Sequence, residues 1–203
     1  MKKMIILLTA LAMIAGFSTV SFAASIVSSS HDLSDSNLGG NALGVTEICV
    51  FCHVPHNPVA TAEGPLWNHT LTTQTFTLYD GTTGASATGI SALCLSCHDG
   101  VTNLDAFGGA AGTAGNDIDT VFSGTTALVG TDLQDDHPVM VAYVGDGTSF
   151  KATPDQGAVI FSNTVECASC HNPHDPEGGG AGTTTFLRAS NTNSTLCLGC
   201  HIK

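Results

Sequence analysis

The sequence predicts a mostly irregular chain, with short helices and few short strands, wrapped around bound groups in two similar halves. Aromatic residues make up only 6% of the 203 residues and glycine contributes 23, so side chains alone would build a weak core. The same short cysteine pattern occurs four times, twice in each half. Small exported domains with weak cores usually depend on disulfides, metals or cofactors.

The chain begins with a predicted secretory leader. Two lysines precede a run of apolar residues and then small residues suited to cleavage after Ala23, so residues 1–23 are predicted to be a signal peptide. The alternative is a retained membrane anchor, but the apolar run is shorter than the roughly 20 residues that span a bilayer. We expect an exported protein without membrane insertion, extracellular or on the cell surface, otherwise periplasmic.

All eight cysteines belong to four Cys-x-x-Cys-His motifs, and each motif predicts covalent attachment of haem. The two sulfurs form thioethers to the haem, and the adjacent histidine ligates the iron. Disulfides would leave the histidine after every pair unexplained, and zinc sites use different spacings. The sequence therefore predicts four haem c groups. The motifs are Cys49-Val-Phe-Cys52-His53, Cys94-Leu-Ser-Cys97-His98, Cys167-Ala-Ser-Cys170-His171 and Cys197-Leu-Gly-Cys200-His201.

Histidine also best supplies the second ligand of each iron, because Met140 is the only methionine after the predicted leader. Five histidines lie outside the four motifs, and an internal repeat ranks them. Each half contains an upstream histidine, a Cys-x-x-Cys-His-x-Pro-His motif and a second motif. His69 has no counterpart near Phe186-Leu187-Arg188, so we rank it fifth, as a polar residue beside Trp67 or a propionate partner. The predicted distal ligands are His31, His56, His137 and His174.

The His-x-Pro-His spacing limits which iron His56 and His174 can bind. Each lies three residues after a motif histidine and cannot reach around the ring to the same iron, so each is predicted to bind a neighbouring haem. The competing interpretation is a surface histidine after a proline turn. An iron with two histidine ligands has no open position, so the site predicts outer-sphere electron transfer rather than enzymatic catalysis.

The predicted halves span residues 24–125 and 126–203 and together form one haem-cored unit. A glycine-rich stretch over 107–133 is expected to be a surface connection, as is 178–182. Strands are predicted over 76–79, 139–143 and 158–161, with helix limited to short turns around the motifs. The formal net charge is −12, which excludes nucleic-acid binding and favours cationic partners.

The motifs and their surroundings resemble the exported multihaem cytochromes c, and among these the filament-forming tetrahaem cytochromes of metal-reducing bacteria. The resemblance covers essentially the whole chain after the leader. Its segments are His31-Asp-Leu-Ser, Glu47-Ile-Cys-Val-Phe-Cys-His-Val-Pro-His-Asn57, Pro65-Leu-Trp-Asn-His69, Cys94-Leu-Ser-Cys-His-Asp-Gly100 and Asp136-His-Pro-Val139.

The resemblance implies an extracellular electron conduit that passes electrons to partner cytochromes or external metal oxides. It also implies a homo-polymer in which His56 or His31 of one subunit ligates the terminal haem of the next, held by Cys197, Cys200 and His201. A soluble periplasmic shuttle has the same haem arrangement and remains open. A multihaem reductase would need an open iron position, and a disulfide-stapled surface protein would contain no haem.

Overall fold

The computed structural model describes residues 25–38, 43–59, 64, 66–180 and 185–203, and the predicted leader lies outside them. Most of these residues are in turns, bends and irregular segments. The regular elements, in chain order, are α2 (Asp35–Leu38), η2 (Cys49–Phe51), β1 (Thr75–Phe76), β2 (Ala85–Ser86), α3 (Gly89–His98), α4 (Ile118–Val121), β3 (Val141–Ala142), β4 (Thr164–Val165), α5 (Cys167–Cys170), η3 (Thr192–Ser194) and η4 (Cys197–Gly199).

Each cysteine motif coincides with a helix or a 3-10 turn. The second motif occupies the end of α3, and α5 contains the third. The first and fourth motifs form the 3-10 turns η2 and η4. Helix is not confined to the motifs, however, because α2, α4 and η3 lie outside them.

The strands form two separate antiparallel pairs of two residues each, β1 with β2 and β3 with β4. β1 and β3 overlap the predicted strands over 76–79 and 139–143. The predicted strand over 158–161 is wrong, because only Phe161 has a bridge there, to Thr164 beyond a tight turn. Its apolar residues follow a loop rather than extending as a strand.

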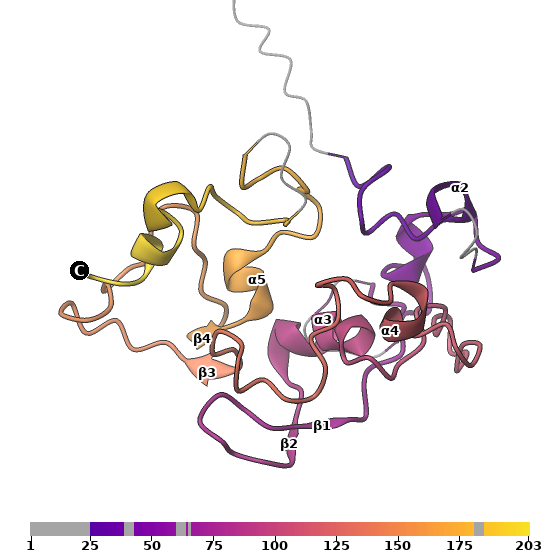
Figure 1. Ribbon diagram of the computed structural model, residues 1–203, viewed down its shortest axis with the longest axis horizontal. Helices are drawn as coiled ribbons and strands as arrows, with labels where there is room; N and C mark the ends of the chain where they lie inside the picture. The colour runs from indigo at the N-terminus through magenta and orange to yellow at the C-terminus, as the bar shows by residue number, and fades with distance from the viewer. Residues whose placement is uncertain (1–24, 39–42, 60–63, 65, 181–184) are drawn as a thin grey trace, which may run out of the picture.

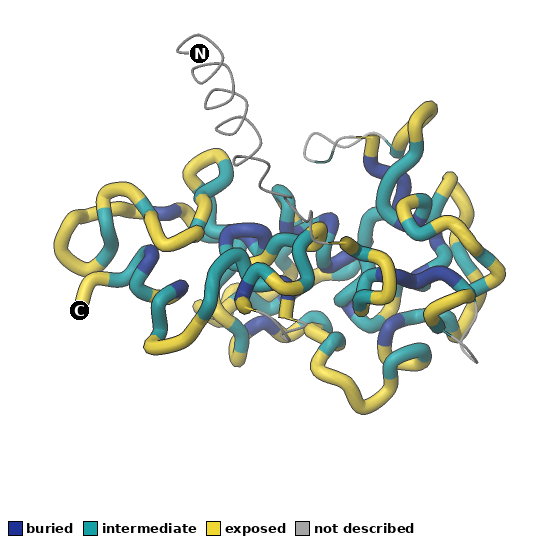
Figure 2. The backbone as a smooth tube through the Cα atoms, turned by 90° about the horizontal axis from the view of Figure 1, so that it is seen from above, coloured by how far each residue is buried: buried dark blue, intermediate teal, exposed yellow. Residues whose placement is uncertain are grey.

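The clustered buried side chains form two small groups rather than a single large core. Phe51 and Ile118 belong to the first group. The second contains Phe76, Leu95 and Leu133. Figure 2 shows the buried backbone as short pieces distributed along the molecule, with exposed loops around them. Neither group resembles a continuous packed layer.

The connection over 107–133 is mostly exposed or half-buried, as expected of a surface loop, but two of its apolar side chains are buried. Ile118 is 4% exposed and Leu133 is 3% exposed, and the first turn of α4 is capped by Asp117, whose side chain accepts from Thr120 N. The amide of Leu133 also donates to Thr77 O at 2.8 Å. Residues just after the predicted boundary at 125/126 are therefore packed onto the first half.

The two halves repeat one backbone arrangement around their first motifs. His53 forms an isolated antiparallel bridge with Trp67, and His171 forms the equivalent bridge with Leu187. The pairing fixes the backbone at each motif histidine against a second, distant segment. It matches the alignment of 66–68 with 186–188 that the repeat predicts.

Side chains reinforce the same repeat. Asn68 Nδ2 donates to Val50 O at 2.6 Å, and Arg188 Nε donates to Ala168 O at 2.6 Å. Val50 and Ala168 each follow the first cysteine of a motif. An asparagine in one half and an arginine in the other thus make the equivalent hydrogen bond to the backbone of the motif turn.

Figure 1 shows α2 and the C-terminus at opposite ends of the molecule, with α3 and α5 side by side between them. Across the described segments, every helix is too short or too polar to cross a membrane.

Candidate haem-binding sites

All eight motif cysteines are described, and none of them is joined to another in a disulfide. Those of the first two motifs approach each other. Burial, together with the nearby Cys49, raises the pKa of Cys52 to about 11. Burial, followed by the neighbouring Cys52 thiol, raises the pKa of Cys97 well above its usual value. The cysteines of the first and second motifs are therefore neighbours.

The remaining motifs continue this order. The Cys94 and Cys167 thiols interact side by side where α3 meets α5, which raises the pKa of Cys94 and lowers that of Cys167. Burial raises the pKa of Cys170, and the nearby Cys200 and Cys197 raise it further. The motif cysteines thus form a continuous series in the order first, second, third, fourth.

Three of the four motif histidines have a second histidine ring beside them, and each partner comes from outside the motifs. The ring centroids are 6.2 Å apart for His31 and His98, 6.1 Å apart for His53 and His174, and 6.3 Å apart for His137 and His201.

These separations match two imidazoles bound to opposite sides of one metal ion. A metal–imidazole bond is about 2.0–2.1 Å long and the ring centroid lies roughly 1.1 Å beyond the nitrogen, which gives centroids about 6.3 Å apart. Direct ring stacking would bring the centroids closer. The three pairs therefore fit the dimensions of a haem iron with two histidine ligands.

Hydrogen bonds fix the tautomer of several of these rings. The Nδ1 atoms of His98, His171 and His137 lie 2.6, 2.9 and 3.0 Å from the carbonyl oxygens of Ala127, Thr185 and Pro138. A carbonyl only accepts, so Nδ1 carries the proton and the Nε2 lone pair is left for a metal.

Burial keeps the His31–His98 pair neutral. It lowers the pKa of His31 from 6.5 to about 4, with a further lowering from the nearby His98. Burial also lowers the pKa of His98. Neutral imidazole is the form that binds metals, so this pair is in the ligating state at neutral pH. The ring of Phe186 packs on His31 with centroids 4.2 Å apart and holds it in place.

The predicted distal ligand His56 does not lie beside a motif histidine. It is exposed, and no ring contact joins it to another histidine within the described segments. His171 likewise makes no ring contact with another histidine among those residues, although it lies near enough to His31 and His98 to lower the pKa of both, and its Nδ1 is bound to Thr185. Three of the four predicted distal histidines therefore face a motif histidine, and His56 does not.

His69 is completely buried, and its ring contacts the second motif. Its Nδ1 lies 2.9 Å from Thr70 O, and its Nε2 lies 3.5 Å from Cys97 Sγ. Burial lowers its pKa. Both ring nitrogens thus have protein contacts, which places His69 beside an attachment cysteine rather than opposite a motif histidine.

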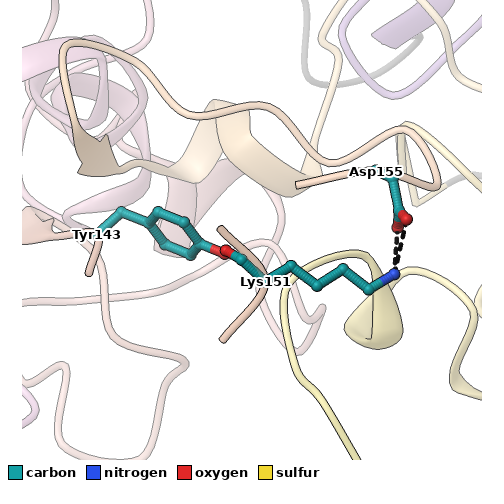
Figure 3. Close-up of polar contacts among 3 residues, drawn as sticks. All are labelled: Tyr143, Lys151 and Asp155. Atoms are coloured by element: carbon teal, nitrogen blue, oxygen red, sulfur yellow. Dashed lines mark hydrogen bonds and ion pairs between the residues drawn. The ribbon is translucent and has the colours of Figure 1, made fainter. Parts of the chain in front are cut away.

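The fourth motif is held by the segment over 143–155, shown in Figure 3. The hydroxyl of Tyr143 donates to Lys151 O at 2.7 Å, and Lys151 Nζ lies 2.6 Å from Asp155. The amide of Lys151 donates to Cys200 O at 2.8 Å, and that of Asp155 donates to Gly199 O at 2.9 Å. Phe150 packs on the motif histidine His201 with centroids 4.9 Å apart.

Sequence reasoning missed Glu166 and the two packing rings, Phe186 and Phe150. Glu166 is a carboxylate only 5% exposed, immediately before the third motif. The sequence did mark Glu166 as unusual, since it is the only charged residue that directly precedes a motif. Nothing in the sequence distinguishes Phe186 and Phe150 from other aromatic residues.

The described residues contain no cluster of three or more His, Cys, Asp or Glu side chains arranged to hold a metal ion. Comparison of the sequence with protein-family models and with curated proteins gives no match.

Proposed function

We propose that this chain is a tetrahaem c-type cytochrome that transfers electrons outside the cytoplasm and works as an extracellular conduit. The observation that carries the proposal is the set of three histidine pairs. Each joins a motif histidine to a histidine outside the motifs, at the separation expected across one iron.

Haem bound at these sites would supply one-electron chemistry at iron. In this proposal the motif cysteines would hold the groups covalently, and each histidine pair would ligate one iron and exclude small substrates. The close succession of attachment cysteines keeps neighbouring groups near enough for electrons to pass between them. The acidic surface favours cationic acceptors such as metal ions, and partner cytochromes with basic patches.

We further propose that His56 ligates the iron held by His171 in an adjacent subunit. The repeat supports this, because His56 follows His53 as His174 follows His171, and His174 faces His53. The resemblance implied His56 or His31 as the donor and the His201 site as the acceptor. His31 and His201 already have partners at ligand-pair separations, which leaves His56 and His171.

The first experiment is negative-stain electron microscopy of the haem-containing extracellular fraction. Mass spectrometry of the same fraction tests for this chain with four attached haems. Filaments of the tetrahaem chain support the conduit. A monodisperse periplasmic monomer would favour the shuttle instead, and a chain without haem would overturn the cytochrome assignment.

The variant His56→Ala tests the intersubunit ligand. We expect it to retain four haems, to lose filaments and to bind carbon monoxide at one iron. Added imidazole should bind the open ferric iron of the variant and restore its low-spin spectrum without restoring filaments. The control Asn57→Gly changes the neighbouring exposed residue, whose φ of 54° glycine tolerates, and should polymerise normally. Normal filaments of His56→Ala would contradict the proposed ligand.

A further inference from the structure

Glu166 is a buried carboxylate at the contact between α3 and α5. It directly precedes the third motif, and it is only 5% exposed. Its Oε2 atom accepts the amide of Ser91 at 3.0 Å and also contacts the Ser91 hydroxyl. The Ser91 hydroxyl oxygen in turn accepts the amide of Cys167 at 3.1 Å. The carboxylate thus caps the start of α3 from a distant part of the chain.

No cation neutralises this carboxylate among the described residues. Lys151 is paired with Asp155 at 2.6 Å. Arg188 donates to Ala168 O and lies 5.8 Å from the ring centroid of Phe161. Hydrogen bonds, the N-terminal ends of α3 and α5 and the more distant Arg188 offset part of the negative charge without an ion pair, and a helix end contributes about half a charge. A net negative field therefore remains inside the junction.

The same junction contains two of the predicted attachment cysteines. Cys167 is the residue after Glu166, and Cys94 lies one helical turn beyond Ser91 on α3. The two thiols interact with each other, so both attachment points lie beside the capped helix start. Any haem attached to either cysteine would be close to this charge.

We propose that Glu166 lowers the reduction potentials of the haems attached at Cys94–Cys97 and Cys167–Cys170, which rests on the proposed electron-transfer function. Reduction adds one electron to a ferric iron and makes it ferrous, without forming or breaking a bond. A fixed negative charge nearby opposes the added electron, and it does so strongly because burial weakens solvent screening. Glu166 is thus a tuning residue at the point where electrons pass between the halves.

The decisive variant is Glu166→Gln, which removes the charge and keeps the shape of the side chain. At a fixed applied potential, we expect the ferrous-to-ferric ratio of the two neighbouring haems to rise roughly tenfold. The haem held by Cys197 and Cys200, attached on a separate turn, should change little. A redox titration followed by NMR of the haem methyl groups resolves the individual haems.

Three further variants separate charge from capping. Glu166→Asp keeps the charge and should retain potentials close to those of the parent. Ser91→Ala removes hydrogen bonds from the cap and keeps the charge, so it should lower thermal stability without raising the potentials. Glu47→Gln removes an exposed carboxylate two residues before the first motif and should have little effect, because solvent screens it.

Two outcomes overturn different statements. If mass spectrometry finds no haem on the parent chain, the proposed function fails. If Glu166→Gln carries four haems and keeps the parent potentials at every haem, the proposed function stands and the tuning role of Glu166 is wrong. Equal shifts in Glu166→Gln and Ser91→Ala would also reject it, because they would assign the effect to the cap.

Discussion

The imidazoles of His53 and His174 lie nearly parallel, with an interplanar angle of 19° and centroids 6.1 Å apart. His53 belongs to the first half of the repeat and His174 to the second. The other two pairs each stay within one half. A group bound between His53 and His174 would therefore join the halves, in addition to the contact of α3 with α5.

Replacing His174 with alanine should open one iron and leave the other sites unchanged. In the holoprotein we expect carbon monoxide to bind the reduced haem held by His53, because its second axial ligand is gone. Optical titration with carbon monoxide measures this. His69→Gln is the control and should bind none, since His69 contacts Cys97 rather than a motif histidine. If His69→Gln bound carbon monoxide and His174→Ala did not, His69 rather than His174 would be the iron ligand.

Acid should release His31 only at low pH. Its pKa in the folded chain is about 4, below its ordinary 6.5, mainly because of burial. Its contribution to stability is therefore present above about pH 6.5 and is lost as the pH falls toward about 4, since the unfolded chain binds the proton first. We expect the low-spin signal of the His98 haem to persist at about pH 5 and to be lost only below about 4, because a bound iron would also compete with the proton for the ring.

Electron paramagnetic resonance of the ferric protein follows this transition. The variant His31→Ala should already show one high-spin haem at neutral pH, and acid should change that signal little. A parent protein that turns high-spin at the His98 site near pH 6.5 would show that burial does not protect His31.

Gly89 should tolerate no side chain. Its φ is +60°, and an added Cβ would meet Glu166, 2.9 Å from the carboxyl carbon. We expect Gly89→Ala to destabilise the holoprotein by about 2–4 kcal/mol, from backbone strain and the clash together. Gly84, with a φ of +74° and nothing within 4 Å, is the matched control, and Gly84→Ala should lose only about 1 kcal/mol.

Denaturant unfolding followed by circular dichroism compares the two variants. Equal losses would show that strain alone operates and that the Glu166 carboxylate can move away from α3. Such mobility would also weaken the tuning role argued for Glu166.

Local features of the fold were predictable because they depend on nearby residues. The motif turns and the strands at Phe76 and Val141 follow from spacing and β-branched or aromatic residues. The histidine pairs were harder to predict from the sequence, because long-range packing brings His31, His137 and His174 to their partners. The repeat narrows the candidates, but it does not say that His174 crosses between the halves.

Other features arise from tertiary contacts that override local preference. Ile118 lies in a glycine-rich segment without clear periodicity, yet it is buried against the first core group. Leu66 and Phe186 adopt φ values of 55° and 54°, which ordinary residues seldom occupy. Glu166 caps α3 across a long stretch of chain, and helix-capping patterns in sequence describe only neighbouring residues.

The two clusters of buried side chains are small, and we expect the chain to need bound haem for a stable fold. The first buried group has four members, Leu33, Phe51, Leu104 and Ile118, and the second has three, Phe76, Leu95 and Leu133. A fully buried side chain of this size contributes about 1.5–3 kcal/mol, whereas ordering each residue costs roughly 1–2 kcal/mol. Covalent haems at four sites would add the missing apolar contact area.

Chain produced without the haem-attachment machinery should therefore fail to fold cooperatively. We expect a broad, featureless thermal transition and rapid amide hydrogen exchange, where the holoprotein melts sharply and protects α3. The variant Cys197→Ala with Cys200→Ala provides a graded test, because it removes one haem at the end of the series. It should keep three haems and a protected α3 while loosening the segment over 143–155, whose hydrogen bonds hold that motif. A haem-free chain that melts cooperatively would show that the polypeptide, not the bound groups, determines the fold.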